Sequence, residues 1–216
     1  MTLTTADTAP HHGTLGRHRL PQLLLVSYLV VWVVLAVSPV DRHDWLLENL
    51  LAVSTAAVLI LTYRRFAFSE VSYVLITLFM ILHAIGAHYT YAKVPFGFWM
   101  KDAFDLSRNH FDRIVHFAFG LLLAYPAYDL FLRTANTRKG WALFMAAITV
   151  ISVSGLFEVI ESWVAQLVSP ELGDAYLGTQ GDIWDAQKDM TMAIIGALFT
   201  VGLTYTMSKS GSSLAR

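Results

Sequence analysis

Six long apolar stretches, separated by short polar segments, dominate the hydrophobic pattern of this chain. They cover roughly residues 20–37, 46–63, 71–91, 110–132, 141–168 and 184–207. Each is close to the ~20 residues that an α-helix needs to cross ~30 Å of hydrocarbon. None alternates apolar and polar residues with a period of two, as the strand of a membrane β-barrel would. We therefore predict an all-α integral membrane bundle of six transmembrane helices over residues 20–207.

Polar segments flank the predicted bundle, and we expect residues 1–19 and 208–216 to form cytoplasmic tails, the first of them flexible. Orientation follows from Lys and Arg, which are enriched in short cytoplasmic loops. Six helices put both termini on one side, and that side collects nine of the 15 basic residues: Arg17, Arg19, Arg64, Arg65, Arg133, Arg138, Lys139, Lys209 and Arg216. This bias predicts that both termini are cytoplasmic and that the loops over 92–109 and 169–183 are extracytoplasmic.

Composition supports a membrane protein and excludes several functional classes. Only 14% of the residues are charged, against about 25% in a globular domain. The net charge of −1 provides no basic field for nucleic acid, so we expect membrane lipids as partners and no nucleic acid. Because the chain has no cysteine, a metal ion would need imidazole, carboxylate or hydroxyl ligands.

Ionisable residues recur in or beside the last four apolar stretches. Charged groups in hydrocarbon are costly, and by default they mark a functional site. In the predicted topology these residues all lie toward the extracytoplasmic face, so we expect one polar pocket there. They are His83 and His88 in the third stretch, His110, Asp112 and His116 in the fourth, Glu158 and Glu161 in the fifth, and Asp182, Asp185 and Asp189 in the sixth.

Asp112 and His116 are four residues apart and therefore share one face of a helix. Both could ligate a metal, or the carboxylate could orient the imidazole and raise its basicity. The alternative is a polar pair that locks helix packing. Asn109 is a plausible N-cap for this helix, and His110 lies closer to the loop.

Glu158 and Glu161 are three residues apart, about 60° around a helix. Two carboxylates this close need a metal, an arginine such as Arg113, or a shared proton. A structural Glu–Arg pair is the alternative interpretation.

The aspartates of the sixth stretch follow a loop with Gly178 and Gly181. Asp182, Asp185 and Asp189 fall on one stripe at i, i+3 and i+7, where Asp182 could serve as a helix cap. His83 and His88 are five apart and share no tight face. We interpret Tyr91 as an aromatic residue of the membrane interface.

The chemistry of this set favours a divalent ion such as Zn, Mn, Fe or Mg, with the eight His and Asp residues as candidate ligands and Glu158 or Glu161 as general base. The leading hypothesis is a metal-dependent hydrolase or transferase that acts from the extracytoplasmic side on a lipid or on an envelope precursor, including a lipid-linked one. One alternative is a proton or cation transporter. Another is a non-catalytic membrane scaffold or regulator.

Four blocks of the chain carry a resemblance to a known family: residues 83–91, residues 108–117, the Glu158–Glu161 pair and residues 178–190. They resemble the YjdF family of multi-pass bacterial inner-membrane proteins, whose function is unknown. That resemblance implies a location in the cytoplasmic membrane and no particular activity. More weakly, the Asp112–His116 block, the two glutamates and Asp185 with Asp189 are similar to the pattern of VanZ-like proteins, which points to the cell envelope.

Overall fold

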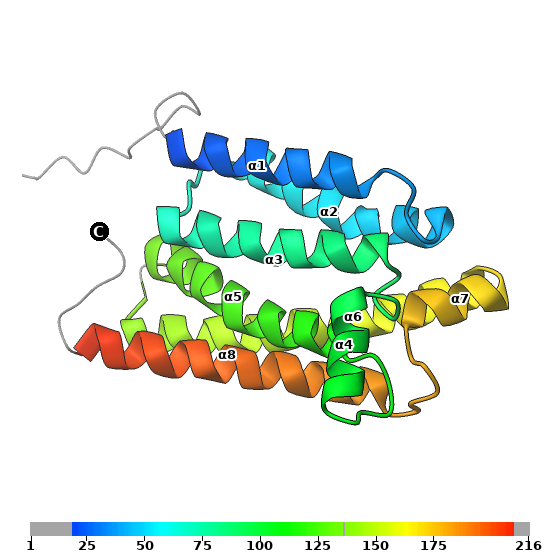
Figure 1. Ribbon diagram of the computed structural model, residues 1–216. Helices are drawn as coiled ribbons and strands as arrows, with labels where there is room; N and C mark the ends of the chain where they lie inside the picture. The colour runs from blue at the N-terminus through cyan, green and yellow to red at the C-terminus, as the bar shows by residue number, and fades with distance from the viewer. Residues whose placement is uncertain (1–18, 136, 210–216) are drawn as a thin grey trace, which may run out of the picture.

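A computed structural model describes residues 19–135 and 137–209 of the protein (Figure 1). Most of the predicted N-terminal tail (1–18) and of the C-terminal tail (210–216) lies outside the described residues. Within the described part all regular structure is helical, which confirms the all-α prediction. The helices are α1 (Arg19–Leu35), α2 (Arg42–Thr62), α3 (Glu70–His88), α4 (Pro95–Ala103), α5 (Phe111–Thr134), α6 (Lys139–Leu167), α7 (Pro170–Leu177) and α8 (Asp185–Lys209).

Five of these helices are long and apolar enough to cross a membrane: α2, α3, α5, α6 and α8. The sequence predicted six, and α1 is the exception because it has only 17 residues. Its end has a local cause. Ser38 adopts a left-handed backbone with φ of 48°, and Pro39 follows it, so the helix cannot continue.

The long helices form two layers, with α1, α2 and α3 in one and α5, α6 and α8 in the other (Figure 1). Helix α5 lies at the centre, where it contacts α3, α6 and α8. The start of α1 and the end of α8 lie at the same end of the bundle (Figure 1). Helices α4 and α7 lie toward the other end, called here the α4–α7 end.

The closest helix pair is α5 with α8, and two glycines permit the approach. A Cβ atom on Gly120 would lie 2.0 Å from the Ala193 carbonyl oxygen, and one on Gly196 would lie 2.2 Å from that of Phe117. Small residues at such crossings let backbones pack directly in membranes. The Thr200 hydroxyl also donates to the Leu121 carbonyl at 2.6 Å. These contacts fix the start of α8 beside the start of α5.

The two segments predicted as loops each contain a short helix, α4 in 92–109 and α7 in 169–183. Each begins with proline in its first turn, where the missing N–H costs nothing. The Asn109 side chain donates to the Val94 carbonyl at 2.9 Å and so attaches α4 to the start of α5. The sequence pattern missed both helices because eight or nine residues carry too little periodicity.

At the opposite end of the bundle, Asp129 is buried and fully engaged. It accepts from the Ser69 backbone N–H at 2.8 Å and from the Ser72 hydroxyl at 3.0 Å. Arg133 lies 3.5 Å away, one turn further along α5. This cluster joins α3 to α5 and satisfies the Asp129 carboxylate within the protein.

Candidate metal centre

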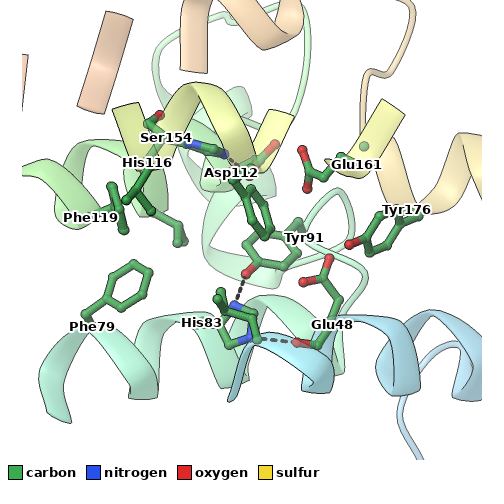
Figure 2. A pocket seen from close by; sticks show the side chains of 15 residues that line it. Glu48, Phe79, His83, Tyr91, Asp112, His116, Phe119, Ser154, Glu161 and Tyr176 are labelled. Atoms are coloured by element: carbon green, nitrogen blue, oxygen red, sulfur yellow. Dashed lines mark hydrogen bonds and ion pairs between the residues drawn. The ribbon is translucent and has the colours of Figure 1, made fainter. Parts of the chain in front are cut away.

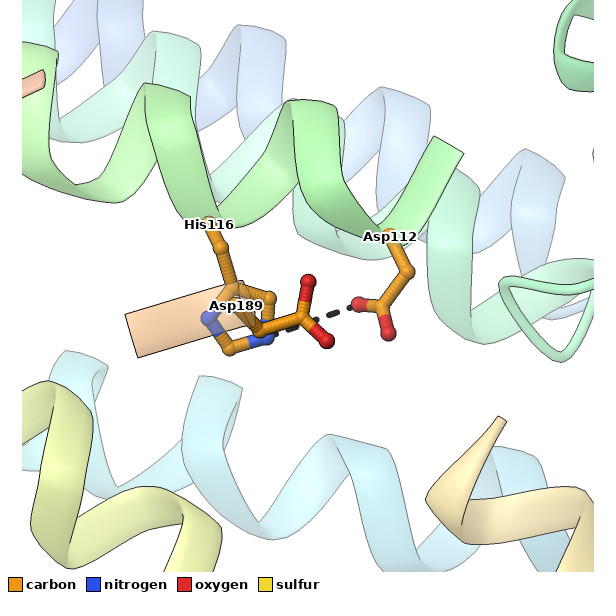
Figure 3. Close-up of side chains that lie close together, drawn as sticks. All are labelled: Asp112, His116 and Asp189. Atoms are coloured by element: carbon orange, nitrogen blue, oxygen red, sulfur yellow. Dashed lines mark ion pairs between the residues drawn. The ribbon is translucent and has the colours of Figure 1, made fainter. Parts of the chain in front are cut away.

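Three predicted ligands converge in the structure: Asp112 and His116 from the first turns of α5, and Asp189 from the second turn of α8 (Figure 3). Each offers one ligand atom, and these atoms all lie within 4.8 Å of one another. The four-residue spacing on α5 brings Asp112 and His116 to the same face, as predicted. The third ligand depends on the close crossing of α5 and α8.

Glu158 of α6 approaches the same imidazole. The Nε2 atom of His116 lies 3.5 Å from Asp112 Oδ1 and 3.5 Å from Glu158 Oε1. Glu158 Oε1 and Asp189 Oδ1 are both buried without a hydrogen-bond partner among the described residues. Buried carboxylate oxygens are costly unless a proton or a cation satisfies them. One imidazole and three carboxylates thus surround a point where positive charge would be stabilising.

The other two aspartates of the α8 stripe are neutralised by arginines. Arg108 donates to Asp185 and also to the Gly178 and Thr179 carbonyls, at 2.9 and 2.6 Å. Arg113 lies 2.6 Å from Asp182 and 2.9 Å from Asp185, whereas its Nε is 3.8 Å from Asp189. Asp189 is therefore the aspartate of this stripe that lacks a close arginine.

Arg113 was one candidate to compensate the glutamates of α6, but it turns to the aspartates instead. No ion pair among residues 19–135 and 137–209 joins Arg113 to Glu158 or Glu161; Glu158 lies beside His116. Asp182, outside the spanning segments, also pairs with Lys188 at 2.7 Å. The Lys188 ammonium, together with Arg113, holds the pKa of Asp182 well below its usual range.

His110 and His88 lie outside the group of three. The N-cap of α5 is His110, one residue after the predicted Asn109, and it makes no capping hydrogen bond. Asn109 Oδ1 accepts instead from the Phe111 N–H at 3.0 Å. Burial, together with Arg113 and Arg108, lowers the pKa of His110. His88 donates from Nδ1 to the Leu35 carbonyl at 2.7 Å, so it ties α3 to the end of α1.

A cavity of about 600 Å³, including its open mouth, lies beside the group of three and takes its lining from several helices (Figure 2). Asp112 and His116 form part of one wall, and Glu48 and Glu161 contribute further carboxylates. The remaining lining is mainly aromatic and aliphatic: Leu51, Phe79, Tyr91, Val115, Phe119, Val153, Phe157 and Tyr176, with Ser154, Gly178 and His83. The cavity therefore combines an apolar interior with several acidic groups.

His83 lines this cavity, but both of its ring nitrogens are engaged (Figure 2). Nε2 lies 3.1 Å from the Glu48 carbonyl, which can only accept, so Nε2 carries the proton. Nδ1 then accepts from the Tyr91 hydroxyl at 2.5 Å. In this arrangement neither nitrogen of His83 has a lone pair free for a metal ion.

Tyr91 is held in this position by its backbone and by Gly86. Its φ of 48° is unusual for a bulky residue and marks a site of local strain. A Cβ atom on Gly86 would lie 2.5 Å from the Tyr91 ring, so glycine is needed for the ring to pack there. The prediction that Tyr91 belongs to the membrane interface is thus corrected, because its hydroxyl points into the bundle.

Sequence reasoning also missed two acids at the start of α2. Glu48 is 3% exposed and Asp44 1% exposed, although the apolar pattern suggested a loop at Asp44. The helix begins earlier because Asp41 caps it, accepting from the His43 and Asp44 N–H groups. The sequence signal for these two acids is their four-residue spacing, which puts Asp44 and Glu48 on one helix face just after the capping Asp41.

These features define a multi-span membrane protein with a buried His/Asp/Glu cluster at one end of its helix bundle. Residues 20–210 match the family described as "Predicted membrane protein (DUF2238)", and the chain belongs to that family. It is 37% identical over 185 residues to inner membrane protein YjdF of Escherichia coli (strain K12), covering 84% of this chain and 88% of that protein. No solved structure matches the chain. These relationships confirm the predicted family and place the protein in the bacterial inner membrane.

Proposed function

We propose that this protein is a metal-dependent membrane hydrolase or transferase that acts on a lipid or a lipid-linked envelope precursor. The observation that supports the proposal is the convergence of Asp112, His116 and Asp189 within 4.8 Å beside a cavity. One imidazole and two carboxylates suit Zn, Mn, Fe or Mg. Three protein ligands also leave coordination positions open for water and substrate, as catalytic sites require.

The chemistry of such a site would be hydrolysis or transfer at a carbonyl or phosphoryl group. A bound divalent ion would polarise that group and lower the pKa of a coordinated water. Glu158, whose Oε1 is 3.5 Å from His116 Nε2, is placed to take the proton of the water as general base. Glu161, which lines the cavity three residues further along α6, is the second candidate for this role.

The lining of the cavity favours a substrate with an apolar part. Phe79, Val115 and Phe119 form apolar surface beside the acidic groups. All three belong to helices that are long and apolar enough to span a membrane, so a lipid chain bound in the cavity would lie among apolar side chains. A lipid or a lipid-linked precursor supplies both the chain and a polar group for the metal centre.

The orientation of the protein is part of this proposal. Helix α1 rises about 26 Å at ~1.5 Å per residue, so slight tilting or local thinning of the bilayer would let it serve as a sixth crossing. The bias of Lys and Arg toward the end opposite α4 and α7 favours a cytoplasmic location for both termini. The α4–α7 end, with the metal centre, would then face the extracytoplasmic side.

Transport is less well supported than catalysis. A proton or cation path needs ionisable groups across the membrane. Between His116 and Asp129, α5 carries no Asp, Glu, His, Lys or Arg, and Asp129 is satisfied by Ser69, Ser72 and Arg133. The acidic cluster is therefore confined to one end of this central helix.

The test is the metal content of detergent-purified protein after loading with Zn²⁺ or Mn²⁺ and dialysis. We expect about one ion per chain in the wild type and in the control Asp174→Asn, which changes an exposed carboxylate of α7. His116→Gln and Asp189→Asn should lose the ion while remaining monodisperse. A wild-type protein that retains no ion, or variants that retain it fully, would refute the metal centre.

Catalysis is tested separately in nanodiscs made from bacterial inner-membrane lipids. Lipid products are followed by mass spectrometry with metal-loaded protein, with chelator-treated protein and with Glu158→Gln. We expect products only with the metal-loaded wild type. Metal-dependent ion flux across liposomes without any lipid product would instead favour the transporter.

A further inference from the structure

We propose that the cavity wall formed by Glu48 and Glu161 binds a primary ammonium group, so that the substrate of this site carries an amine. The inference rests on the proposed function and names a substrate class for the same cavity. It arises from two carboxylates of the cavity that neither the arginines nor the candidate metal ion neutralises.

Carboxylates from two different helices meet at this wall. Glu48, on α2, is 3% exposed, and Glu161, on α6, lines the same cavity. None of the ion pairs formed within residues 19–135 and 137–209 includes either glutamate. Figure 2 shows their carboxylates turned toward the same part of the cavity, next to the Tyr176 hydroxyl. The nearby arginines are already committed to Asp182 and Asp185.

Asp44 adds a third acid behind this wall. It lies one helical turn before Glu48 on the same face of α2, it is 1% exposed, and both of its carboxylate oxygens are buried without a hydrogen-bond partner. A buried ionised carboxylate costs several kcal/mol unless it is paired and hydrogen-bonded. Glu48 lines the cavity directly. A cation bound to its carboxylate would therefore also offset the negative charge of Asp44 behind it.

The spacing of these acids favours a molecular cation over a second metal ion. Ligands must converge to about 2.0–2.6 Å from a divalent ion. Among the described residues, Asp112, His116 and Asp189 form the single group of three His or acidic side chains whose ligand atoms lie within 4.8 Å. An ammonium nitrogen is bound through longer N–H···O bonds of about 2.7–2.9 Å, and its hydrogens reach acceptors in different directions.

Aromatic rings complete the surroundings that an ammonium group prefers. Tyr91 and Tyr176 line the cavity together with the two glutamates, and ring faces attract cations. The Tyr91 hydroxyl donates its hydrogen to His83, so its oxygen can still accept from an N–H group. His83 and Gly86 thereby keep the Tyr91 hydroxyl oxygen in position to accept a hydrogen bond in the cavity.

A primary ammonium fits better than a quaternary one because the buried carboxylates need hydrogen bonds. A primary ammonium has three N–H donors, whereas a trimethylammonium group has none. The same ammonium chemistry occurs in a free amine and in a lipid headgroup. Phe119 and Val153, which lie in the same cavity, provide apolar surface for a chain attached to the amine.

The experiment is calorimetric titration of the metal-loaded protein with ethanolamine, choline and ethylene glycol. A parallel arm uses nanodiscs with phosphatidylethanolamine or phosphatidylcholine. We expect ethanolamine or its lipid to bind at least tenfold more tightly than the choline counterpart, and ethylene glycol not to bind. Binding of the lipid alone would identify a headgroup site, and binding of free ethanolamine would identify a soluble amine.

Variants of the two wall glutamates then test whether they bind the ammonium group. Glu48→Gln and Glu161→Gln should each weaken ammonium binding at least tenfold and keep the metal ion, whereas Glu171→Gln, an exposed glutamate of α7, should change neither. If a cavity variant misfolds, Asp44→Asn and the ligand series on wild-type protein still test the site. Equal binding of choline and ethanolamine, no ammonium binding, or a second divalent ion lost in Glu48→Gln would overturn the inference. Ammonium binding without metal binding would refute only the metal centre.

Discussion

Gly196→Ala tests whether the spacing of α5 and α8 brings together the ligands of the proposed metal centre. The added Cβ atom would lie 2.2 Å from Phe117 O, 2.7 Å from Leu121 N and 3.2 Å from Gly120 C. All three are backbone atoms of α5, so no side-chain rotation relieves the clash. Ordinary van der Waals contact begins at 3.4 Å, and the helices must therefore separate locally by about 1.2 Å.

This separation acts directly on the ligand set. Asp112 and His116 move with α5, whereas Asp189 moves with α8, and ligand distances in a metal site are held to about 0.2 Å. We expect metal affinity to fall by about 10- to 100-fold, as when supporting groups of a site are lost, which corresponds to roughly 1.4–2.8 kcal/mol. Overpacking should also lower stability by about 1–3 kcal/mol.

The assay is titration of metal-free protein with Zn²⁺ or Mn²⁺, combined with thermal unfolding in detergent. Gly202→Ala is the matched control, because it lies on the same helix and an added Cβ atom meets nothing within 4 Å. Both variants gain the same helix preference, about 1 kcal/mol. If Gly196→Ala unfolds at a lower temperature than the control but binds the metal as tightly as wild type, the spacing of α5 and α8 does not control the ligand set.

Three further predictions concern contacts around the site. Arg108→Ala should lower the free energy of unfolding by about 1.5–3 kcal/mol, because buried Asp185 would keep Arg113 as its one remaining cationic partner among the described residues. Adding Asp185→Asn should recover part of this loss, and no recovery in thermal unfolding would argue against the pairing. Thr200→Val should cost about 0.6 kcal/mol, the average for an interhelical hydrogen bond in a membrane, as measured by unfolding; an unchanged midpoint in repeated melts would count against the bond. Because Lys188 and Arg113 lower the pKa of Asp182, its stabilising contribution is present above the unfolded value of about 3.9 and is lost only as pH falls through the lower folded pKa. Hydrogen exchange over residues 178–184 should thus give equal protection at pH 7 and pH 5 after correction for intrinsic rates, and loosening at pH 5 would contradict this assignment.

The class of protein and much of the site follow from the amino-acid sequence. Long apolar runs can bury their backbone polar groups in a bilayer only as helices, so the all-α membrane fold followed from hydropathy. Helix periodicity likewise brought Asp112 and His116 to one face, because positions four apart lie one above the other. The number of membrane crossings depends on α1, which Ser38 and Pro39 end after 17 residues.

Which aspartates of α8 pair closely with an arginine depends on the tertiary structure. On the sequence, Asp182, Asp185 and Asp189 form one stripe of candidate ligands, in which Asp182 could also serve as a helix cap. The fold gives the first two to Arg113 and Arg108 and leaves Asp189 beside His116. This pairing depends on which helices are in contact and on how closely they pack. Between α5 and α8 the distance is set by the backbone contacts of Gly120 and Gly196.

Only the tertiary structure identifies Glu48 and Tyr91 as part of the site. Nothing in the local sequence says that the start of α2 faces the cavity, or that a tyrosine after α3 turns back onto His83. Periodicity fixes the face of a single helix, but the direction in which that face points is set by packing against other helices. That is why the character of this site could be predicted from sequence and its full membership could not.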